Sequence, residues 1–115
     1  MQEETRFKNK ILPILKRMPN SWVLKTQEVA RSGVPDILMC LSGIFISIEL
    51  KTEGGTVSKL QDYNLKKIVK AGGIGLVIQP SNLDASIQFL ENLAKEGIKN
   101  EQCSSTKKGS KRDKN

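Results

Sequence analysis

The sequence predicts an α/β domain in which a mixed central sheet is flanked by helices. Apolar residues recur at helical spacing in three segments, and apolar runs short enough to be strands lie between them. In chain order these segments give helix, three strands, helix, strand and helix, and 115 residues is the length of one domain. The expected domain covers residues 1–97, and the Lys/Ser-rich residues 98–115 are expected to form a basic, disordered tail.

The first helix is expected over residues 2–17, because Phe7, Ile11 and Leu15 recur on one face. Pro13 lies within this pattern, where proline kinks or shortens a helix. The second helix is expected to begin near Ser58 and to end before Gly72 and Gly73. The third is expected to open at Ser81, whose spacing to Asp84 resembles a capping box, and to end at Gly97.

Strands are expected over residues 21–28, 35–41, 44–51 and 74–79, where apolar and β-branched side chains dominate. Ser42-Gly43 separates the second strand from the third, and a two-residue connection of this kind is typical of a β-hairpin. The sequence therefore predicts that residues 35–51 form an antiparallel pair.

The composition excludes several classes of chemistry. The chain has no histidine, so Ser-His-Asp and Cys-His catalysis and imidazole-based zinc sites are absent. Two cysteines cannot form a disulfide framework, and no apolar run approaches the roughly 20 residues of a membrane span. We therefore expect a reduced, cytoplasmic compartment and no membrane partner. The net charge of +7 favours polyanionic partners.

Three charged side chains are expected to meet at one end of the hairpin. Alternation places Glu49 and Lys51 together on one face of their strand, and antiparallel pairing brings Asp36 beside them. Two neighbouring carboxylates repel unless a cation neutralises them, and Mg²⁺ is bound through one or two carboxylates. The alternative interpretation is a surface salt bridge, which is the commoner meaning of this spacing. The position on a strand–turn–strand unit, preceded by Gly33-Val34-Pro35, favours a metal site.

These residues resemble a known motif. Pro35-Asp36, twelve further residues, and Glu49-Leu50-Lys51 are similar to the PD-(D/E)XK motif of the restriction-endonuclease-like nuclease superfamily. The fuller string around it, with Gln61 and Gly72-Gly73, resembles the VRR-NUC branch, which occurs in small stand-alone proteins, many of them from phages. The resemblance covers about residues 4–79 and implies a restriction-endonuclease-like αβββαβ core.

The resemblance also implies roles for individual residues. Asp36 and Glu49 would bind Mg²⁺ or Mn²⁺, the Leu50 backbone carbonyl would add a ligand, and Lys51 would be the catalytic lysine. The family carries a further glutamate on its first helix, for which Glu4 is the choice.

Two of the implied positions have competing interpretations. Glu3 is adjacent to Glu4, and either acid would also suit the positive end of a helix dipole. Gln61 would lie near the active site by the resemblance, but Ser58-x-x-Gln61 also fits a capping box. Both accounts of Gln61 can hold together, so it is taken as a supporting catalytic residue.

The leading hypothesis is a divalent-metal-dependent endodeoxyribonuclease selective for branched DNA such as four-way junctions. The resemblance implies a homodimer in the cytoplasm of a bacterial or phage-infected cell, and Trp22 and Phe89 are candidates either for the dimer surface or for the core. The alternatives are a non-catalytic DNA-binding module and a general restriction-like or recombination exonuclease. The presence of Asp36, Glu49 and Lys51 argues against the first alternative. A panel of DNA substrates distinguishes the second alternative from the leading hypothesis.

Overall fold

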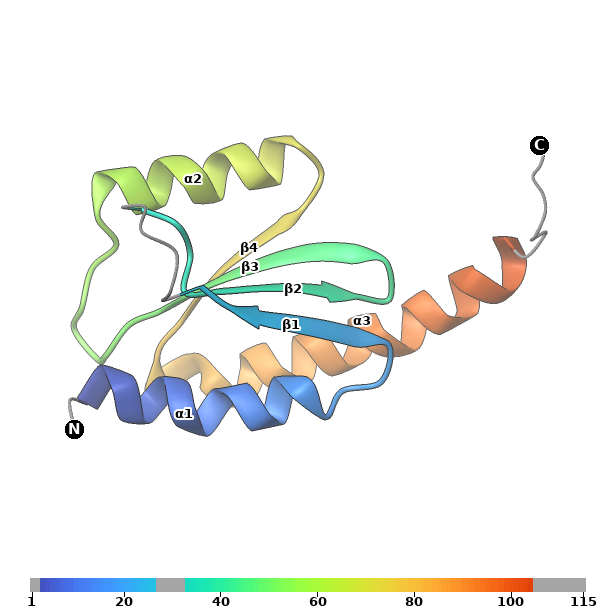
Figure 1. The fold of residues 1–115 in the computed structure, drawn as a ribbon, viewed down its shortest axis with the longest axis horizontal. Coiled ribbons are helices and arrows are strands. Elements are labelled where there is room, and N and C mark those ends of the chain that lie inside the picture. The colour runs from blue at the N-terminus through green and yellow to red at the C-terminus, as the bar shows by residue number, and fades with distance from the viewer. Residues whose placement is uncertain (1–2, 27–32, 105–115) are drawn as a thin grey trace.

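A four-stranded mixed sheet with helices on both faces forms the centre of the fold, as predicted (Figure 1). The computed structural model describes residues 3–26 and 33–104. The elements, in chain order, are α1 (Glu3–Lys16), β1 (Ser21–Lys25), β2 (Ile37–Leu41), β3 (Ile44–Leu50), α2 (Lys59–Lys70), β4 (Ile74–Ile78), the 3₁₀ turn η1 (Pro80–Asn82) and α3 (Leu83–Ser104). The order of helices and strands is the one expected from the sequence.

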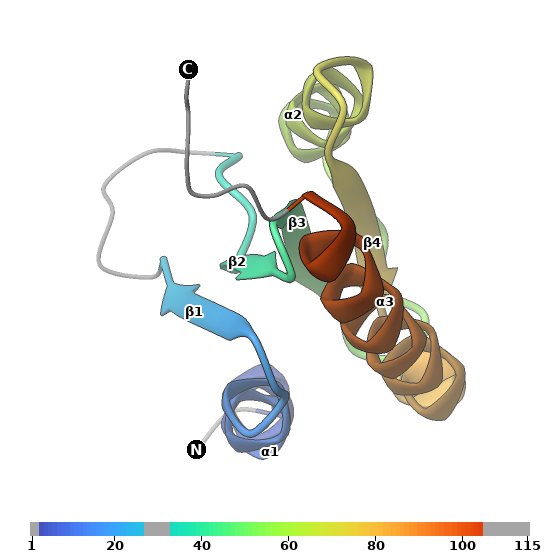
Figure 2. The same ribbon diagram turned by 90° about the vertical axis from the view of Figure 1, so that its right-hand side faces the viewer.

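The strands follow one another across the sheet as β1-β2-β3-β4, with β4 parallel to β3 and the other pairs antiparallel. Helices α1 and α3 lie on one face and α2 on the other, as Figures 1 and 2 show from two sides. The main core lies on the α1/α3 face, where Ile37, Met39, Ile46 and Ile48 are fully or almost fully buried. The α1/α3 face of β2 and β3 is therefore aliphatic.

The hairpin between β2 and β3 is confirmed together with its turn. Ser42 and Gly43 both have positive φ angles, 52° and 85°, as a two-residue turn with the twist of the flanking strands requires. The turn sets the register, in which Ile37 lies opposite Ile48. Residues 27 and 28 of the first expected strand lie outside the described residues, and β1 ends at Lys25.

Helix α1 continues through Pro13 to Lys16, so the expected kink or shortening does not divide the helix. Pro13 is exposed, and its ring therefore does not disturb the packed face formed by Phe7, Ile11 and Leu15. None of the described helices is both long and apolar enough to cross a membrane.

Two expectations about the third helix are wrong. Ser81 does not cap it, because Ser81 lies within η1 and its backbone N–H and hydroxyl both donate to the Glu53 carboxylate, at 3.0 and 2.9 Å. The helix also continues past Gly97 to Ser104, so the first residues of the expected disordered tail are helical. Glycine ends a helix where it adopts a left-handed conformation, as Gly72 does with φ 103°, and Gly97 remains helical.

Gly33 precedes the candidate site and packs closely against α2, and a substitution there tests how much this packing contributes to stability. Its φ is +82°, its carbonyl accepts a 2.8 Å hydrogen bond from Asn64, and an added Cβ would overlap Leu60 of α2. Gly33→Ala should therefore lower the free energy of unfolding by about 3 kcal/mol, through both backbone strain and overpacking.

Gly54→Ala is the matched control for this prediction. Gly54 has φ +84° but nothing within 4 Å of an added Cβ, so only the backbone term of about 1 kcal/mol applies. Denaturant unfolding measures both variants. Equal losses would mean that Gly33 is not pressed against α2.

Candidate active site

The two carboxylates predicted to meet do lie side by side at the end of the hairpin. Asp36 immediately precedes β2, and the pairing of Ile37 with Ile48 places Asp36 opposite Glu49 on β3. The Asp36 Oδ2 atom accepts a 2.8 Å hydrogen bond from the backbone N–H of Leu50. This bond replaces a rung of the sheet just beyond the end of β2, so it fixes the Asp36 side chain against β3.

Glu49 is 1% exposed, which is unusual for a carboxylate. It lies on the α2 face of β3, where Gln61 Nε2 donates a 2.6 Å hydrogen bond to Glu49 Oε2. The Lys51 Nζ atom is 3.9 Å from the same oxygen. The other oxygen, Oε1, is buried without a hydrogen-bond partner among the described residues. Leaving a carboxylate oxygen in this state is costly unless something absent from the bare chain binds it.

Gln61 both caps α2 and contacts the carboxylate pair. Its backbone N–H donates to the Ser58 hydroxyl and its Oε1 accepts from the Ser58 N–H, at 3.1 and 2.9 Å, which completes the capping box that begins α2. Because the amide oxygen faces Ser58, the amide nitrogen faces Glu49. The cap of α2 therefore orients the side chain that holds Glu49 in place.

The surroundings of Glu49 raise its pKa to about 7. Desolvation by burial is the largest cause, and the negative charge of Asp36 adds to it, while Lys51 acts in the opposite direction. Glu4 also raises the pKa of Glu49 through its charge, so it lies within electrostatic reach of the site. A cation placed between Asp36 and Glu49 would oppose both effects, because it favours the ionised form of each carboxylate.

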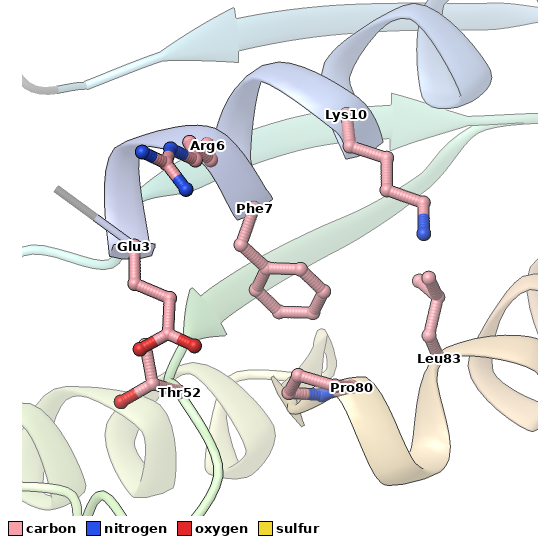
Figure 3. Close-up of a pocket in the computed structure, with 7 residues that line it drawn as sticks. All are labelled: Glu3, Arg6, Phe7, Lys10, Thr52, Pro80 and Leu83. Atoms are coloured by element: carbon pink, nitrogen blue, oxygen red, sulfur yellow. The ribbon is translucent and has the colours of Figure 1, made fainter. Parts of the chain in front are cut away.

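The structure separates Glu4 from Glu3. Both are exposed in the first turn of α1, where their charges also suit the helix dipole. Glu4 acts on Glu49, whereas Glu3 faces a neighbouring cavity near Thr52 (Figure 3). Of the two acids, Glu4 is therefore the one whose charge acts on Glu49.

Lys8 is a residue of the site that the motif did not identify. Its Nζ atom is 3.6 Å from Asp36 Oδ1, and the Lys8 side chain is only 12% exposed. The signal was present in the sequence, because residues four apart share one face of a helix and Lys8 follows Glu4 by four. Asp36 thus has a backbone donor on one oxygen and an ammonium group on the other.

The available ligands suit a hard divalent cation. No group of three or more His, Cys, Asp or Glu side chains in metal-binding geometry occurs within the described ranges, so protein carboxylates would supply only part of the coordination. Mg²⁺ commonly uses one or two carboxylates and keeps several waters. The unpartnered Oε1 of Glu49 and the oxygens of Asp36 fit such a site.

The Leu50 carbonyl is directed toward the same side. Lys51 N–H donates to Ile78 of β4, whereas Leu50 N–H donates to Asp36 on the opposite side of β3. Since the N–H and C=O of one strand residue point to the same edge, the Leu50 carbonyl also points to the Asp36 side.

The raised pKa of Glu49 predicts how stability of the metal-free protein depends on pH. The unfolded chain ionises Glu49 near pH 4.5 and the folded chain near pH 7. Between these values the folded state binds more protons, so the free energy of unfolding falls as pH rises from about 4.5 to 7 and then levels off. Glu49→Gln should remove this fall and gain roughly 1–3 kcal/mol at pH 8, with little gain at pH 4.

Thermal unfolding in EDTA across this pH range measures the effect. Glu91→Gln, the same chemical change at an exposed position of α3, is the control and should change stability by less than about 0.5 kcal/mol. Identical pH profiles for the wild type and Glu49→Gln would contradict the assignment.

Comparison of the chain with family models, curated proteins and solved structures finds no match. The chemistry and geometry of the carboxylate pair, together with the motif resemblance, are therefore what support a function.

Proposed function

We propose that this protein is a divalent-metal-dependent endodeoxyribonuclease of the PD-(D/E)XK superfamily, related to its VRR-NUC branch. The observation that carries the proposal is the pair Asp36 and Glu49, with the buried, unpartnered Oε1 of Glu49 and Lys51 beside it. The buried Oε1 atom of Glu49 has no hydrogen-bond partner among the described residues, and burial together with the Asp36 charge raises the pKa of Glu49 to about 7, as expected of two carboxylates without the cation that would neutralise them. A metal-binding carboxylate accounts for both features.

Asp36, Glu49 and the Leu50 carbonyl would hold Mg²⁺ or Mn²⁺. Such an ion, when bound, supplies positive charge to the phosphate oxygens and lowers the pKa of a bound water. Lys51 lies where its ammonium group can stabilise negative charge that develops on the phosphate, since it is within 3.9 Å of Glu49. Gln61 and Lys8 act as positioning residues, because each holds one of the two carboxylates.

The direct test is cleavage of a labelled four-way junction with Mg²⁺ or Mn²⁺ and with EDTA. Cleavage with metal and none with EDTA supports the proposal, and binding without cleavage under all conditions indicates the non-catalytic alternative. A panel of junction, flap, duplex and single-stranded DNA tests the preference for branched DNA. Equal degradation of linear single strands would contradict junction selectivity while leaving a nuclease.

We further propose that the working unit is a two-fold homodimer, because resolving a junction takes two cuts on symmetry-related strands. Trp22 and Phe89 are 63% and 42% exposed, so neither completes the monomer core. Of the two residues, Trp22 is the better candidate for a contact between the two protomers. It lies in one cross-strand row with Cys40 and Phe45, on the sheet face opposite the main core. Light scattering of the wild type and Trp22→Ser measures the association.

Removing residues 105–115, which follow α3, is expected to weaken DNA binding. These residues carry a net charge of +4, and affinity depends less on salt when the protein neutralises fewer phosphates. The expected result is lower affinity at low salt and a flatter salt dependence, measured by fluorescence anisotropy, with turnover of bound DNA retained. Unchanged affinity at low salt would show that the segment only adds solubility.

A further inference from the structure

A concave region lies near the carboxylate pair. A cavity of about 280 Å³ lies between the first turns of α1 and the start of α3, and it is near the lower limit of small-molecule sites at roughly 300 Å³. Its lining residues, drawn in Figure 3, are Glu3, Arg6, Phe7, Lys10, Thr52, Pro80 and Leu83.

The cavity neighbours the candidate active site on two elements, through residues that are adjacent in the chain. Thr52, in its wall, directly follows Lys51 at the end of β3. Along α1, Phe7 of the cavity directly precedes Lys8 of the site. Successive helix residues point about 100° apart, so the cavity and the site occupy adjacent faces of α1. A strand bound at the carboxylates would therefore pass beside the cavity.

The lining combines an apolar floor with a basic rim. Phe7 and Leu83 are each 8% exposed, and the Phe7 ring points toward Pro80 (Figure 3). Arg6 and Lys10, four residues apart on α1, are exposed at the rim, and neither forms an ion pair with any described residue. Two unpaired cations beside an apolar floor are complementary to a phosphate joined to a base.

We propose that this cavity binds one nucleotide of the substrate strand next to the scissile phosphate. Its base would contact the floor at Phe7 and Pro80, and its phosphate would contact Arg6 and Lys10. Glu3 repels phosphate from the Thr52 end, which places the phosphate at the Arg6–Lys10 rim. This inference rests on the proposed nuclease function and identifies where its substrate is held.

The test removes the two protein charges and one phosphate charge, separately and together, and compares the resulting losses of affinity. Binding is measured in the Lys51→Ala background, which is expected to bind DNA with little turnover. The probes are copies of the cleaved oligonucleotide, each with a single uncharged methylphosphonate at one of the linkages around the cleavage position. At one linkage, removing the charge should weaken binding by about 2- to 5-fold. The same probe should cause no further loss in the Arg6→Gln/Lys10→Gln variant.

Three further measurements test whether the coupling is specific. Lys16→Gln/Arg17→Gln removes the same charge at the last residue of α1 and the residue after it, and it should lower affinity without abolishing the effect of any one methylphosphonate. Glu3→Gln should strengthen binding of the charged probe. An abasic site at the coupled nucleotide should weaken binding as well, because the base leaves the floor of the cavity.

The outcomes separate this inference from the nuclease assignment. If the wild type cleaves DNA but Arg6 and Lys10 show no coupling to any linkage, the nucleotide site is overturned and the nuclease stands. If coupling occurs but abasic DNA binds equally well, the base contact is overturned. If the wild type cleaves no DNA with Mg²⁺ or Mn²⁺, the nuclease assignment falls and this inference falls with it.

Discussion

A Glu49→Gln variant is expected to lose DNA cleavage almost completely while folding more stably than the metal-free wild type. The buried Oε1 atom of Glu49 has no hydrogen-bond partner among the described residues, and burial with the Asp36 charge raises its pKa to about 7. A neutral amide removes that unfavourable charge and can still accept the hydrogen bond from Gln61. It cannot supply the charge that a divalent cation needs, so activity should fall by at least about 10³-fold.

Asp36→Asn should lose activity to a similar extent but gain less stability than Glu49→Gln. Asn can still accept the bond from the Leu50 N–H and removes the charge that raises the pKa of Glu49, but it leaves the largely buried Lys8 ammonium without its carboxylate. The free energy of unfolding at pH 8 should therefore be lower in Asp36→Asn than in Glu49→Gln. Loss of activity in Glu49→Gln without loss of stability separates loss of the metal site from general unfolding.

Metal binding gives a second measurement that does not depend on cleavage. Saturating Mg²⁺ stabilises a folded protein that binds it, by about 2.7 kcal/mol at one hundred times the dissociation constant. The wild type should show a rise in Tm with Mg²⁺, both variants should lose it, and Glu91→Gln should retain it. Full turnover by Glu49→Gln, or an undiminished rise in its Tm, would contradict the assignment.

The convergence of the site could be predicted from sequence because it depends on local geometry. The two-residue turn at Ser42-Gly43 sets the hairpin register, and alternation then determines which side chains share a face. With those two rules Asp36, Glu49 and Lys51 meet whatever the rest of the chain does. The capping box at Ser58 is equally local, and it fixes the amide oxygen of Gln61 on Ser58, which leaves the amide nitrogen free for Glu49.

The features that sequence could not supply depend on how elements pack. Strand alternation alone predicts which face of the sheet Glu49 lies on, but it does not predict that Glu49 is buried. The burial arises because α2 covers β3 and β4. The contact between Lys8 and Asp36 depends on how α1 is rotated against the sheet. The expected cap at Ser81 was wrong for the same reason. Glu53, 28 residues away in sequence, binds both donors of Ser81 in the folded chain.

Lys51→Ala is expected to reduce turnover far more than DNA binding. The Lys51 ammonium lies 3.9 Å from Glu49 Oε2, and its side chain is 17% exposed, so it acts at the carboxylates in partly desolvated surroundings. A charge in this position matters most when negative charge develops on the phosphate in the transition state. The expected loss in kcat is about 10²–10³-fold. The change in Kd should stay within about 3-fold, as for loss of one exposed ion pair.

The matched control is Lys66→Ala, which removes a lysine of α2 whose exposed side chain pairs with Asp62. It should leave kcat unchanged, because Lys66 lies four residues along α2 from Asp62 and interacts with that residue at 2.9 Å rather than with Glu49. Single-turnover cleavage and equilibrium binding, measured on the same labelled DNA, separate the two quantities. Equal losses in affinity and in turnover would make Lys51 a phosphate anchor instead of a catalytic residue.

Lys51→Ala should also raise the Mg²⁺ concentration that the site requires at pH 7. Lys51 is the cation that holds down the pKa of Glu49 against burial and against the charge of Asp36. Without it the pKa of Glu49 rises further, so protons compete with Mg²⁺ up to higher pH. The Mg²⁺ concentration for half-maximal rise in Tm should therefore increase in Lys51→Ala at pH 7 and return toward the wild-type value at pH 9. A shift that is the same at both pH values would mean that Lys51 does not act on Glu49.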